Sequence, residues 1–395
     1  MGEFEAFAQA ASASGGRATA PALRSLDNVA VLGGAADGRL IAALCLSEGA
    51  SVTLFSAYGA ELDAMAASAG VTLRGAGPVG TYQINRENAP SISTTAQLDV
   101  AVAQADVIFL TGPVHKQRTY AMVLADHLRD GQVLVLAPGR SLGALEAAWL
   151  LRIGGSVADI TLVEAQNLPF WWRKEGSVLH LSPTKGTPVA TLPSGRNEVI
   201  DALGRYLPGL DVRASVLASG FEDGSALVEV PALLMGGPAA ASGAPSVPMG
   251  GTELPENHNF ANLIGAAHRA TIAAMLAERA RVAQVFGVRD LPDLQAMIDR
   301  YAGTKTGDGI RPVPDPQGAR NVLRDGVIGS LVPLVSAAEL AGVEIPVTRA
   351  MIALASTVLG ADVAAAGRRL DTIGIRASDV STARRAMEAI AVGQA

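Results

Sequence analysis

The sequence predicts an α/β protein in which a doubly wound parallel sheet is followed by a second, all-helical domain. Short apolar runs alternate with segments of helical spacing up to about residue 200, and beyond that point helical spacing continues without clear strands. The chain has 395 residues, which suits two domains of roughly 100–200 residues each. We therefore expect an N-terminal arm at 1–27, a sheet domain at 28–200 and a helical domain at 201–395.

The first strand–helix–strand unit begins at residue 28. Residues 28–33 (NVAVLG) form a short β-branched run that ends in glycine, and residues 36–48 space their leucines and small side chains as a helix does. Residues 51–55 (SVTLF) form a second apolar run. A strand, a glycine turn, a helix and a strand within about 30 residues predict a βαβ unit with parallel strands.

The same alternation continues through the rest of the sheet domain. Strands are expected at 106–110, 132–136 and 160–163, and helices at 117–128 and 142–151. Each of these strands is a continuous apolar run, without alternating polar positions. Such strands are typical of a parallel sheet that is covered by helices on both faces.

The second half of the chain is predicted to be helical. Apolar residues recur at helical spacing in 264–286, 294–301, 331–341, 347–359 and 378–391. Before these segments lies a stretch at 236–255 that is rich in Gly, Pro, Ala and Ser. A long loop of this composition in a compact protein is typical of a lid or of a flexible connection.

The composition argues against several classes of function. The net charge of −6 and the lack of a Lys/Arg run argue against a nucleic-acid partner, and no uncharged apolar stretch has the length of a membrane span. The first residues hold two acids and no basic segment, unlike a secretory signal. The single cysteine, Cys45, excludes internal disulfides and a thiolate zinc site. We expect a cytoplasmic protein without a metal, and its apolar helix faces favour a homodimer.

The turn after the first strand has the pattern of a dinucleotide site. Its sequence is Gly33-Gly34-Ala35-Ala36-Asp37-Gly38. A dinucleotide-binding Rossmann domain needs a tight turn here, a close approach of the backbone to the pyrophosphate, and a helix N-terminus directed at it. We assign Gly33, Gly34, Ala35 and Ala36 to the cofactor. The alternative is a glycine-rich turn that binds nothing, but the position after the first strand of a βαβ unit favours the nucleotide.

Two strand ends complete the expected cofactor site. The second strand ends at Ser56, where an acid would bind the ribose 2′-hydroxyl and repel a 2′-phosphate. The lack of this acid favours NADP over NAD, although Ser56 equally suits the cap of the next helix. Another strand ends in Thr111, Gly112 and Pro113, which we place near the nicotinamide because ligands bind at the carboxyl ends of such strands.

Three further segments match one pattern in order and spacing. Residues 137–146 (APGRSLGALE) match a turn and helix written NPGR…GALE, and residues 164–173 (EAQNLPFWWR) match ET-x-TLPY-x-x-R. Residues 320–333, which contain Asp325 and end in GSLVP, match RY-x-x-ED…GLVP. With the Rossmann start, the chain resembles the octopine/nopaline dehydrogenase family over about 28–375. The resemblance implies an enzyme that condenses an amino acid's amine with a 2-oxo acid and reduces the imine with NAD(P)H.

The resemblance also implies a proton-transferring histidine held by an aspartate. Asp325 matches that aspartate, and a carboxylate beside an imidazole raises its pKa so that it gives a proton near neutrality. The histidine is expected before a proline in the segment 225–234, but here Val230 precedes Pro231. Valine cannot transfer a proton, so either another group replaces the histidine or the reaction differs.

Three residues are candidates for the missing proton donor. Glu229 stands next to Val230, and a buried carboxyl with a raised pKa would serve as an acid; the alternative is a charge at the end of a strand. His258 follows the loop at 236–255, from which it would reach a cleft, and His268 lies in the next helix. We rank His258 ahead of His268, and the alternative for each is an ordinary surface or core histidine.

Basic residues are the candidates for holding a substrate carboxylate. Lys116 and Arg118 open a helix, where positive charge opposes the helix dipole, so we expect an anionic partner there, either a substrate carboxylate or a cofactor phosphate. The alternative is a pair of solvated surface cations. The resemblance favours Arg320 as a carboxylate fork, with Arg311 as a second arginine. The segment Trp171-Trp172-Arg173 either walls the cleft against an apolar or aromatic group or packs between the domains.

Three functions remain open from the sequence. The first is an NAD(P)H-dependent opine-type dehydrogenase that reduces an imine. The second is an NAD(P)-dependent hydroxy-acid or alcohol dehydrogenase on the same scaffold, which the missing histidine keeps open. The third is a non-catalytic nucleotide-binding protein, for which Ala35, Ser56 and Val230 together give the motive. In the first two cases the partner is a small molecule that carries a carboxylate.

Overall fold

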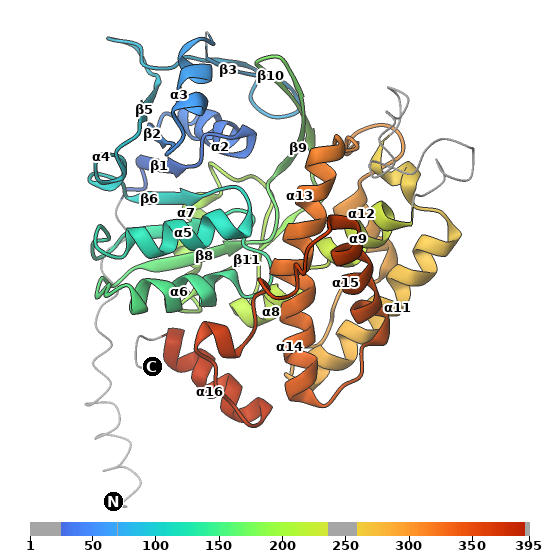
Figure 1. The fold of residues 1–395 in the computed structure, drawn as a ribbon. Helices are drawn as coiled ribbons and strands as arrows, with labels where there is room; N and C mark the ends of the chain where they lie inside the picture. The colour runs from blue at the N-terminus through green and yellow to red at the C-terminus, as the bar shows by residue number, and fades with distance from the viewer. Residues whose placement is uncertain (1–24, 69, 236–258, 392–395) are drawn as a thin grey trace, which may run out of the picture.

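The computed structural model describes residues 25–68, 70–235 and 259–391. They form a sheet domain and a helical domain that lie side by side (Figure 1). Most of the arm expected at 1–27 and all of the loop expected at 236–255 lie outside the described residues. Within the described ranges, no helix is long and apolar enough to cross a membrane.

The larger sheet confirms the predicted α/β class. Its eight strands follow the order β12-β11-β8-β7-β6-β1-β2-β5, and every neighbouring pair is parallel except β11 with β8. The strands are β1 (Asn28–Leu32), β2 (Ser51–Phe55), β5 (Ile92–Thr95), β6 (Val107–Leu110), β7 (Val133–Leu136), β8 (Thr161–Ala165), β11 (Thr187–Leu192) and β12 (Leu210–Val212). Since β1 lies between β2 and β6, the chain is wound outward in both directions from β1. Open sheets of this kind bind ligands at such a reversal of strand order.

Helices cover both faces of this sheet. One buried apolar cluster joins α2 (Ala36–Ser47), α7 (Asn197–Leu203) and the end of α3 (Gly59–Ala66) to the strands. The other face packs against α4 (Leu98–Val102), α5 (Val114–Leu124) and α6 (Gly143–Ile153), and its cluster continues into the helical domain. The two domains therefore share one apolar core, which holds their relative position.

A second, smaller sheet was not predicted. Its strands follow the order β4-β3-β10-β9, with bounds β3 (Val71–Gly75), β4 (Gly80–Tyr82), β9 (Phe170–Glu175) and β10 (Val178–Pro183). The hairpin of β9 and β10 pairs with β3, which is far away in the sequence. The hairpin carries β9 toward the helical domain, as Figure 1 shows beside α13.

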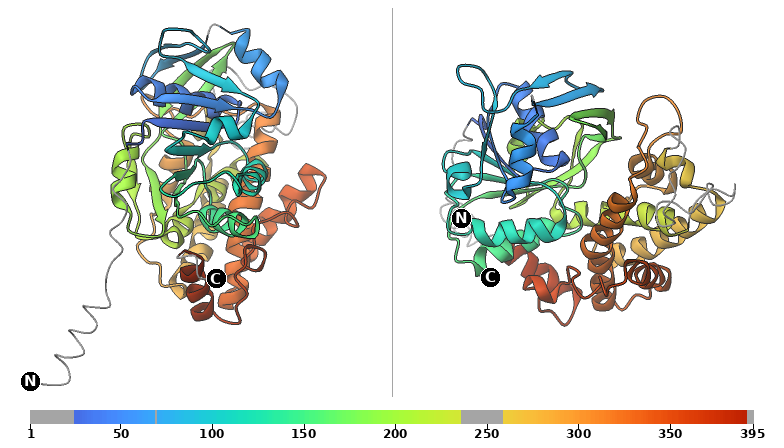
Figure 2. Two further views of the ribbon diagram at one scale, coloured as in Figure 1. Left: turned by 90° about the vertical axis from the view of Figure 1, so that its left-hand side faces the viewer. Right: turned by 45° about the horizontal axis from the view of Figure 1, so that its top comes forward.

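The second half is helical, as predicted, and its last helix packs against the sheet domain. Its elements are α8 (Val216–Glu222), α9 (Ser225–Leu234), η1 (Phe260–Leu263), α11 (Ala266–Val285), α12 (Leu294–Ala302), α13 (Pro316–Gly326), η2 (Val327–Leu331), α14 (Val332–Ala341), α15 (Pro346–Leu359), η3 (Asp371–Ile373) and α16 (Val380–Ala391). The last helix, α16, packs against α6 (Figure 2). Strand β12 also extends the sheet beyond residue 200, where we expected the sheet domain to end.

Candidate active site

The glycine turn between β1 and α2 has the geometry of a phosphate-binding loop. Gly33 has φ +127°, and its N–H donates to the carbonyl of Phe55 at 3.0 Å. A Cβ atom on Gly38 would lie 1.8 Å from the carbonyl oxygen of Gly33, so only glycine lets α2 begin this close to the strand. The helix starts after Ala35, which caps it without a side-chain hydrogen bond. Backbone amides of the first turn therefore remain for an anion.

A glutamate that the sequence did not single out lies at the end of β2. Ser56 is fully buried, and its hydroxyl donates to Oε2 of Glu61 at 2.5 Å. The same oxygen accepts the backbone N–H of Gly34 at 3.2 Å. Glu61 comes from α3, yet its carboxylate occupies the place beside the glycine turn where the strand end usually supplies an acid. The short turn between β2 and α3 brings Glu61 back to Ser56, and the packing of α3 places its carboxylate beside Gly34.

Lys116 lies on the cofactor side of the site and not in the cleft where we expected it. Its Nζ is 3.9 Å from Oε1 of Glu61 and 4.6 Å from the centre of the Tyr58 ring. Arg118, two residues later, pairs with Glu146 at 2.7 Å and so serves to hold α5 on α6. Lys116 therefore faces Glu61 beside the glycine turn, and its role in binding an anionic partner stays a prediction.

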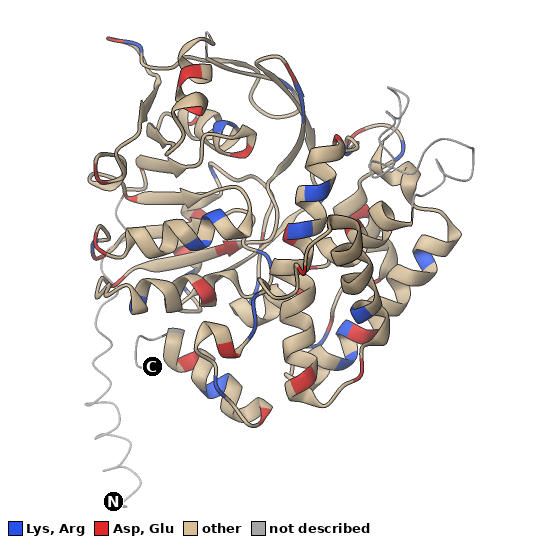
Figure 3. Cartoon of the chain, in the orientation of Figure 1, with Lys and Arg blue, Asp and Glu red and all other residues tan. Residues whose placement is uncertain are grey.

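A cleft of about 470 Å³ opens between the two domains. On the sheet side its wall includes Asp37 at the start of α2 and Arg140 in the loop between β7 and α6, and on the helical side it includes Glu229 and Arg311. Strand β9 supplies Phe170, Trp171 and Trp172. Charged residues of both signs gather where α13 faces the sheet domain (Figure 3). The cleft therefore reaches the start of α2, the helix that follows the glycine turn.

Glu229 joins the two arginines of the cleft. Its Oε1 lies 2.8 Å from Arg311 and its Oε2 3.4 Å from Arg140, which also donates to the hydroxyl of Ser225. Glu229 is only 5% exposed, and although burial alone would raise its pKa, the two guanidinium groups hold that pKa below its usual value. The expectation of a raised pKa is therefore wrong, as is the strand end: Glu229 lies within α9 and remains ionised. The lowered pKa disfavours Glu229 as a proton donor near neutrality.

Asp325 is the buried carboxyl that the prediction placed at the reaction. It lies near the end of α13, and burial raises its pKa to about 6, although the charge of Arg140 and a hydrogen bond from the backbone N–H of Val114 both lower it. Its Oδ1 has no hydrogen-bond partner among the described residues. Val114 opens α5 directly after the loop Thr111-Gly112-Pro113, so this carboxyl of the helical domain touches the strand end expected at the nicotinamide.

Val230, which stands where the resemblance predicts histidine, lies in α9, which packs against α13, the helix of Asp325. A Cβ atom on Gly326, the neighbour of Asp325, would lie 3.4 Å from Cγ2 of Val230. Val230 is fully buried in α9. Its apolar side chain has no proton to give.

Asp37 faces the cleft and not the phosphate site. Its Oδ1 accepts a hydrogen bond from Nε1 of Trp172 at 2.8 Å, so β9 of the small sheet is tied to the start of α2. Burial raises the pKa of Asp37, while the Trp172 bond and the charge of Arg140 lower it. Trp171 reaches the other wall, since a Cβ on Gly303 would lie 2.8 Å from its ring. The two tryptophans thus line the cleft and also bridge the domains.

Arg320 does not reach the cleft. Its guanidinium donates to the backbone carbonyls of Val358 at 3.3 Å and Leu359 at 3.1 Å, at the end of α15. Arginine at this position caps a helix C-terminus, where positive charge is favourable. Arg320 is not among the residues that line the cleft, and its expected role as a carboxylate fork stays a prediction. Arg311, the second arginine, lines the cleft instead.

Of the two candidate histidines, His268 does not line the cleft, and the other falls in the part of the chain that the structure does not describe. His268 is buried near the start of α11, and its Nδ1 accepts the backbone N–H of Gly265 at 3.3 Å. Burial lowers its pKa, so it is a neutral cap of that helix. His258 lies outside the described residues. Among the described residues of the predicted set, Asp325 is the one with a pKa near neutrality.

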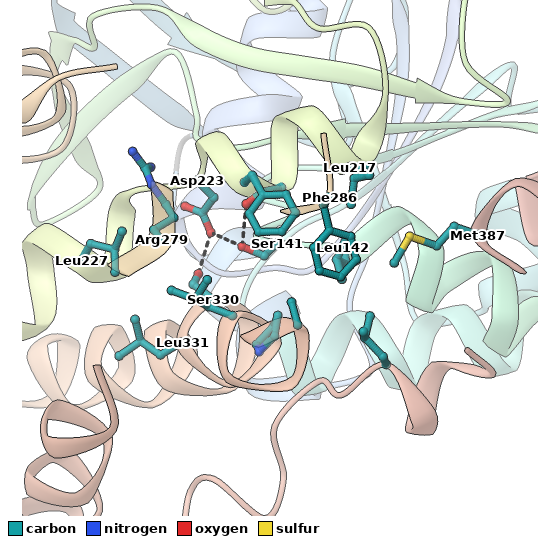
Figure 4. Close-up of a pocket in the computed structure, with 16 residues that line it drawn as sticks. Ser141, Leu142, Leu217, Asp223, Leu227, Arg279, Phe286, Ser330, Leu331 and Met387 are labelled. Carbon is teal, nitrogen blue, oxygen red and sulfur yellow. Dashed lines mark hydrogen bonds between the residues drawn. The ribbon is translucent and has the colours of Figure 1, made fainter. Parts of the chain in front are cut away.

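A separate pocket marks the joint between the domains (Figure 4). There Asp223 accepts hydrogen bonds from the hydroxyls of Ser141 at 3.2 Å and Ser330 at 2.6 Å. Apolar side chains such as Leu142 and Phe286 close the remaining walls, and the cavity is only about 30 Å³. A space of this size holds about one water molecule. We therefore assign it to the packing of the joint.

Nearby, the buried guanidinium of Arg368 strengthens the same joint. It lies 2.8 Å from Glu146 and donates to the backbone carbonyl of Ser141. The carbonyl of Gly329 in η2 in turn accepts the backbone N–H of Ser141 at 3.0 Å. These bonds fix the loop of Arg140 against the π-helical segment that follows Asp325. A π-helical turn is often found beside a functional site.

Two curated proteins are similar to this chain over most of its length, although no family model matches it. "Opine dehydrogenase" of Arthrobacter sp. (strain 1C) is 24% identical over 373 residues, which are 91% of this chain and 98% of that protein. "Protein ocs" of Agrobacterium tumefaciens (strain Ach5) is 24% identical over 303 residues, 74% of this chain and 81% of that protein. The predicted resemblance to the opine dehydrogenase family is thereby confirmed.

Solved structures share the two-domain fold. Octopine dehydrogenase in complex with NADH and agmatine aligns with a TM-score of 0.66 at 17% identity, over 93% of this chain and 98% of that chain. Yersinopine dehydrogenase with NADP+ aligns with a TM-score of 0.59 at 12% identity, over 94% and 99%. D-mandelate dehydrogenase with NADH and anilino(oxo)acetate aligns with a TM-score of 0.59 at 12% identity, over 88% and 100%. The predicted fold class is thus confirmed.

Proposed function

We propose that this protein is an NAD(P)H-dependent dehydrogenase of the opine type. In the overall reaction an amine and a 2-oxo acid combine with NAD(P)H and a proton to give a secondary amine, NAD(P)+ and water. The likeness to curated opine dehydrogenases over nearly the whole chain supports the reaction class. The observation that carries the proposal is the buried Asp325, which meets the strand end after β6 from the helical domain.

The residues of the glycine turn fit a dinucleotide. Gly33 and Gly38 permit a close approach of strand and helix, and the first-turn amides of α2 face no side-chain cap. We place the pyrophosphate at Gly34, Ala35 and Ala36, and the nicotinamide end at Thr111 to Pro113. When bound, the cofactor supplies the hydride.

Asp325 is the proton donor in this proposal. Its protonated form would give a proton to the substrate as the carbonyl oxygen leaves as water, and its ionised form would accept a proton in the reverse direction. Arg140 lies between Asp325 and Glu229 and attracts the substrate carboxylate toward the same point. Glu229 is a positioning residue, because it holds Arg140 and Arg311 in the wall without touching the expected reaction.

A coupled assay tests the proposal directly. We expect NADH or NADPH to be oxidised only when both a 2-oxo acid and an amine are present, with a secondary amine as the product by mass spectrometry. Oxidation with the 2-oxo acid alone would favour the hydroxy-acid dehydrogenase, which the likeness to D-mandelate dehydrogenase supports as the second candidate. Binding without turnover on any panel of substrates would favour the non-catalytic nucleotide-binding protein.

Glu61 leads us to prefer NAD over NADP, opposite to what Ser56 alone favours. Its carboxylate would accept hydrogen bonds from the ribose hydroxyls and repel a 2′-phosphate. We expect the wild type to bind NADH more tightly than NADPH, and Glu61→Gln to narrow that difference by about tenfold, as the loss of a charged hydrogen-bond partner predicts. Fluorescence titration with both cofactors measures this.

The matched control for Glu61→Gln is Asp63→Asn, an exposed carboxylate on the same helix. It should leave the ratio of the two dissociation constants unchanged. Tighter binding of NADPH by the wild type, or equal effects of the two variants, would refute the role of Glu61.

As further proposals we keep the homodimer, which light scattering in solution tests, and the cytoplasmic location, which microscopy of the tagged protein tests.

A further inference from the structure

One buried glutamine joins the loops that follow two neighbouring strands. Gln117 lies near the start of α5 and is only 3% exposed. Its Nε2 donates to the carbonyl oxygens of Gly112 at 3.1 Å and of Pro138 at 2.8 Å. Gly112 lies in the loop after β6 and Pro138 in the loop after β7, and these two strands are parallel neighbours in the large sheet. A single side chain therefore ties the two loops together at the carboxyl end of the sheet.

The backbone joins these loops at their base, and further along they separate. At the base, the N–H of Ala137 donates to the carbonyl of Leu110 at 3.1 Å. The next residue of the second loop, Pro138, has no N–H to give. The N–H after that, from Gly139, donates to Ala165 in β8 at 2.7 Å and so turns away from the first loop. Beyond the base, the amide of Gln117 provides the link between the two loops.

The first loop has room to move on its open side. Gly112 has φ +83°, and a Cβ atom on it would meet no atom of the described residues within 4 Å. Pro113, which follows it, has no N–H with which to anchor the loop. The hydrogen bond from Gln117 to the carbonyl of Gly112 therefore restrains a segment that packing leaves open.

The amide of Gln117 can face only one way. Backbone carbonyls only accept, so the nitrogen must face them, and both of its N–H groups are then used. The Oε1 atom is left buried, without a hydrogen-bond partner among the described residues. Burying such an oxygen is unfavourable, and an apolar side chain of the same length would fill the space without that cost. The two donated bonds are therefore the reason for a glutamine at this position.

Both loops supply groups that act on the carboxyl of Asp325. The loop after β6 continues into α5, where the backbone N–H of Val114 donates to that carboxyl, and the loop after β7 contains Arg140. Both contacts lower the pKa of Asp325 against the effect of burial. Arg324 on the same helix also lowers it, and Asp37 at the start of α2 raises it. The separation of the two loops therefore determines how Val114 and Arg140 lie around this carboxyl.

We propose that Gln117 is a positioning residue for the reaction. It fixes the loop after β6, where we place the nicotinamide, against the loop of Arg140, and so sets the place of both relative to Asp325. Its amide is occupied by two backbone carbonyls, so it acts through the loops and not by contact with the substrate. This inference rests on the proposed function.

Gln117→Met keeps the length of the side chain and removes both donors. We expect kcat to fall by about 10–100-fold, because a small displacement of groups that must meet lowers the rate steeply. The Kd for NADH should change far less, since the glycine turn and Glu61 lie outside the two loops. The limb of the pH profile near pH 6 should move upward by about half a pKa unit, a change of about threefold in the protonation equilibrium, because Val114 and Arg140 would lower the pKa of Asp325 less.

Gln132→Met is the matched control. Gln132 is 1% exposed, and its Nε2 donates to the carbonyls of Val102 at 3.3 Å and Ala105 at 2.8 Å, at the opposite end of the same strands. This variant should also lose stability in chemical denaturation, but kcat and the limb near pH 6 should stay as in the wild type. Equal effects of the two substitutions on kcat and on the limb would show that Gln117 supports the fold alone and would overturn the proposal.

A titration without turnover tests the same contacts. In 13C NMR of protein labelled at the aspartate carboxyl carbons, the signal of Asp325 is identified by its loss in Asp325→Asn. We expect its midpoint to be higher in Gln117→Met than in the wild type and in Gln132→Met, and an unchanged midpoint would overturn the inference. If no amine and 2-oxo acid support NADH oxidation, the proposed function fails, and this titration still decides whether Gln117 sets the surroundings of Asp325.

Gln117→Asn serves as the second variant should Gln117→Met fail to fold. It keeps the amide group but is shorter by one methylene, so it cannot reach both carbonyls. We expect the midpoint of Asp325 to move in the same direction and kcat to fall, while Gln132→Asn changes neither. Wild-type values of both quantities in Gln117→Asn would contradict the role of the two hydrogen bonds.

Discussion

Replacing Asp325 with asparagine is expected to lower kcat for reductive condensation by about 10²–10⁴-fold, the usual contribution of a positioned acid. Asparagine has the same size and accepts the hydrogen bond of Val114, but it has no proton to give. The Kd for NADH should change far less than kcat, because asparagine keeps the contact with Val114 and the glycine turn that we assign to the pyrophosphate lies in the other domain. Steady-state kinetics and a fluorescence titration of NADH measure the two quantities separately.

The pH dependence identifies the group more sharply than the loss of rate does. Since burial raises the pKa of Asp325 to about 6, the protonated form dominates below that pH and the ionised form above it. The rate of reduction should therefore fall as the pH rises through about 6, and the rate of oxidation of the secondary amine should rise over the same interval. Both limbs should be absent from the asparagine variant.

Asp315→Asn is the control on the same helix. Asp315 caps α13 and lines the cleft, and asparagine is an equally good N-cap. This variant should fold as the wild type does and keep both limbs of the pH profile. If the limb near pH 6 persists after Asp325→Asn, or disappears after Asp315→Asn, another group transfers the proton.

Glu229→Gln is expected to destabilise the protein by about 3–5 kcal/mol, the cost of leaving buried charges without their partner. Arg140 and Arg311 are each only 11% exposed at the side chain, and Glu229 is the carboxylate that acts most strongly on each of them. Glutamine keeps the size and the acceptor oxygen, so the loss reports the charge. Chemical denaturation, followed by circular dichroism, measures the free energy of unfolding.

Glu339→Gln is the matched control for this prediction. Glu339 also joins two arginines, Arg349 at 3.0 Å and Arg369 at 2.8 Å, but its side chain is 40% exposed. Surface ion pairs contribute about 0–1 kcal/mol, so this change should be small. Equal effects of the two substitutions would contradict the role of Glu229.

The lowered pKa of Glu229 also makes its contribution to stability depend on pH. This contribution to the free energy of unfolding is present above the pKa of an unfolded glutamate, about 4.3, and is lost as the pH falls through the lowered value.

The elements of the sheet domain were predictable because each buried parallel strand is a continuous apolar run. The strands expected at 28–33, 51–55 and 132–136 all occur with shifts of at most one residue. The hairpin at 170–183 was missed because its strands are amphipathic and pair with the remote β3. The segment around Glu229 was misjudged because Val-Glu-Val-Pro combines β-branched residues with a proline, which favour a strand end over the helix that forms.

The candidate site was predictable where one local motif carries it. The glycine turn and Asp325 lie where the sequence and the resemblance placed them, although their roles stay proposals. The contact of Glu61 with Gly34 and the placement of Glu229 between Arg140 and Arg311 depend on contacts between separate segments of the chain. Arg320 shows what a motif cannot predict. The match located the residue in the sequence, but it did not give the direction of the side chain, which points to the end of α15.

The transfer of deuterium from NADH labelled at C4 of the nicotinamide tests the central claim most directly. With pyruvate and an amino acid that supports turnover present, we predict one deuterium on the carbon that joins the new C–N bond of the secondary amine, and none in lactate. Deuterium recovered in lactate, with the amino acid unchanged, would show that the cleft reduces the carbonyl itself and would contradict the account.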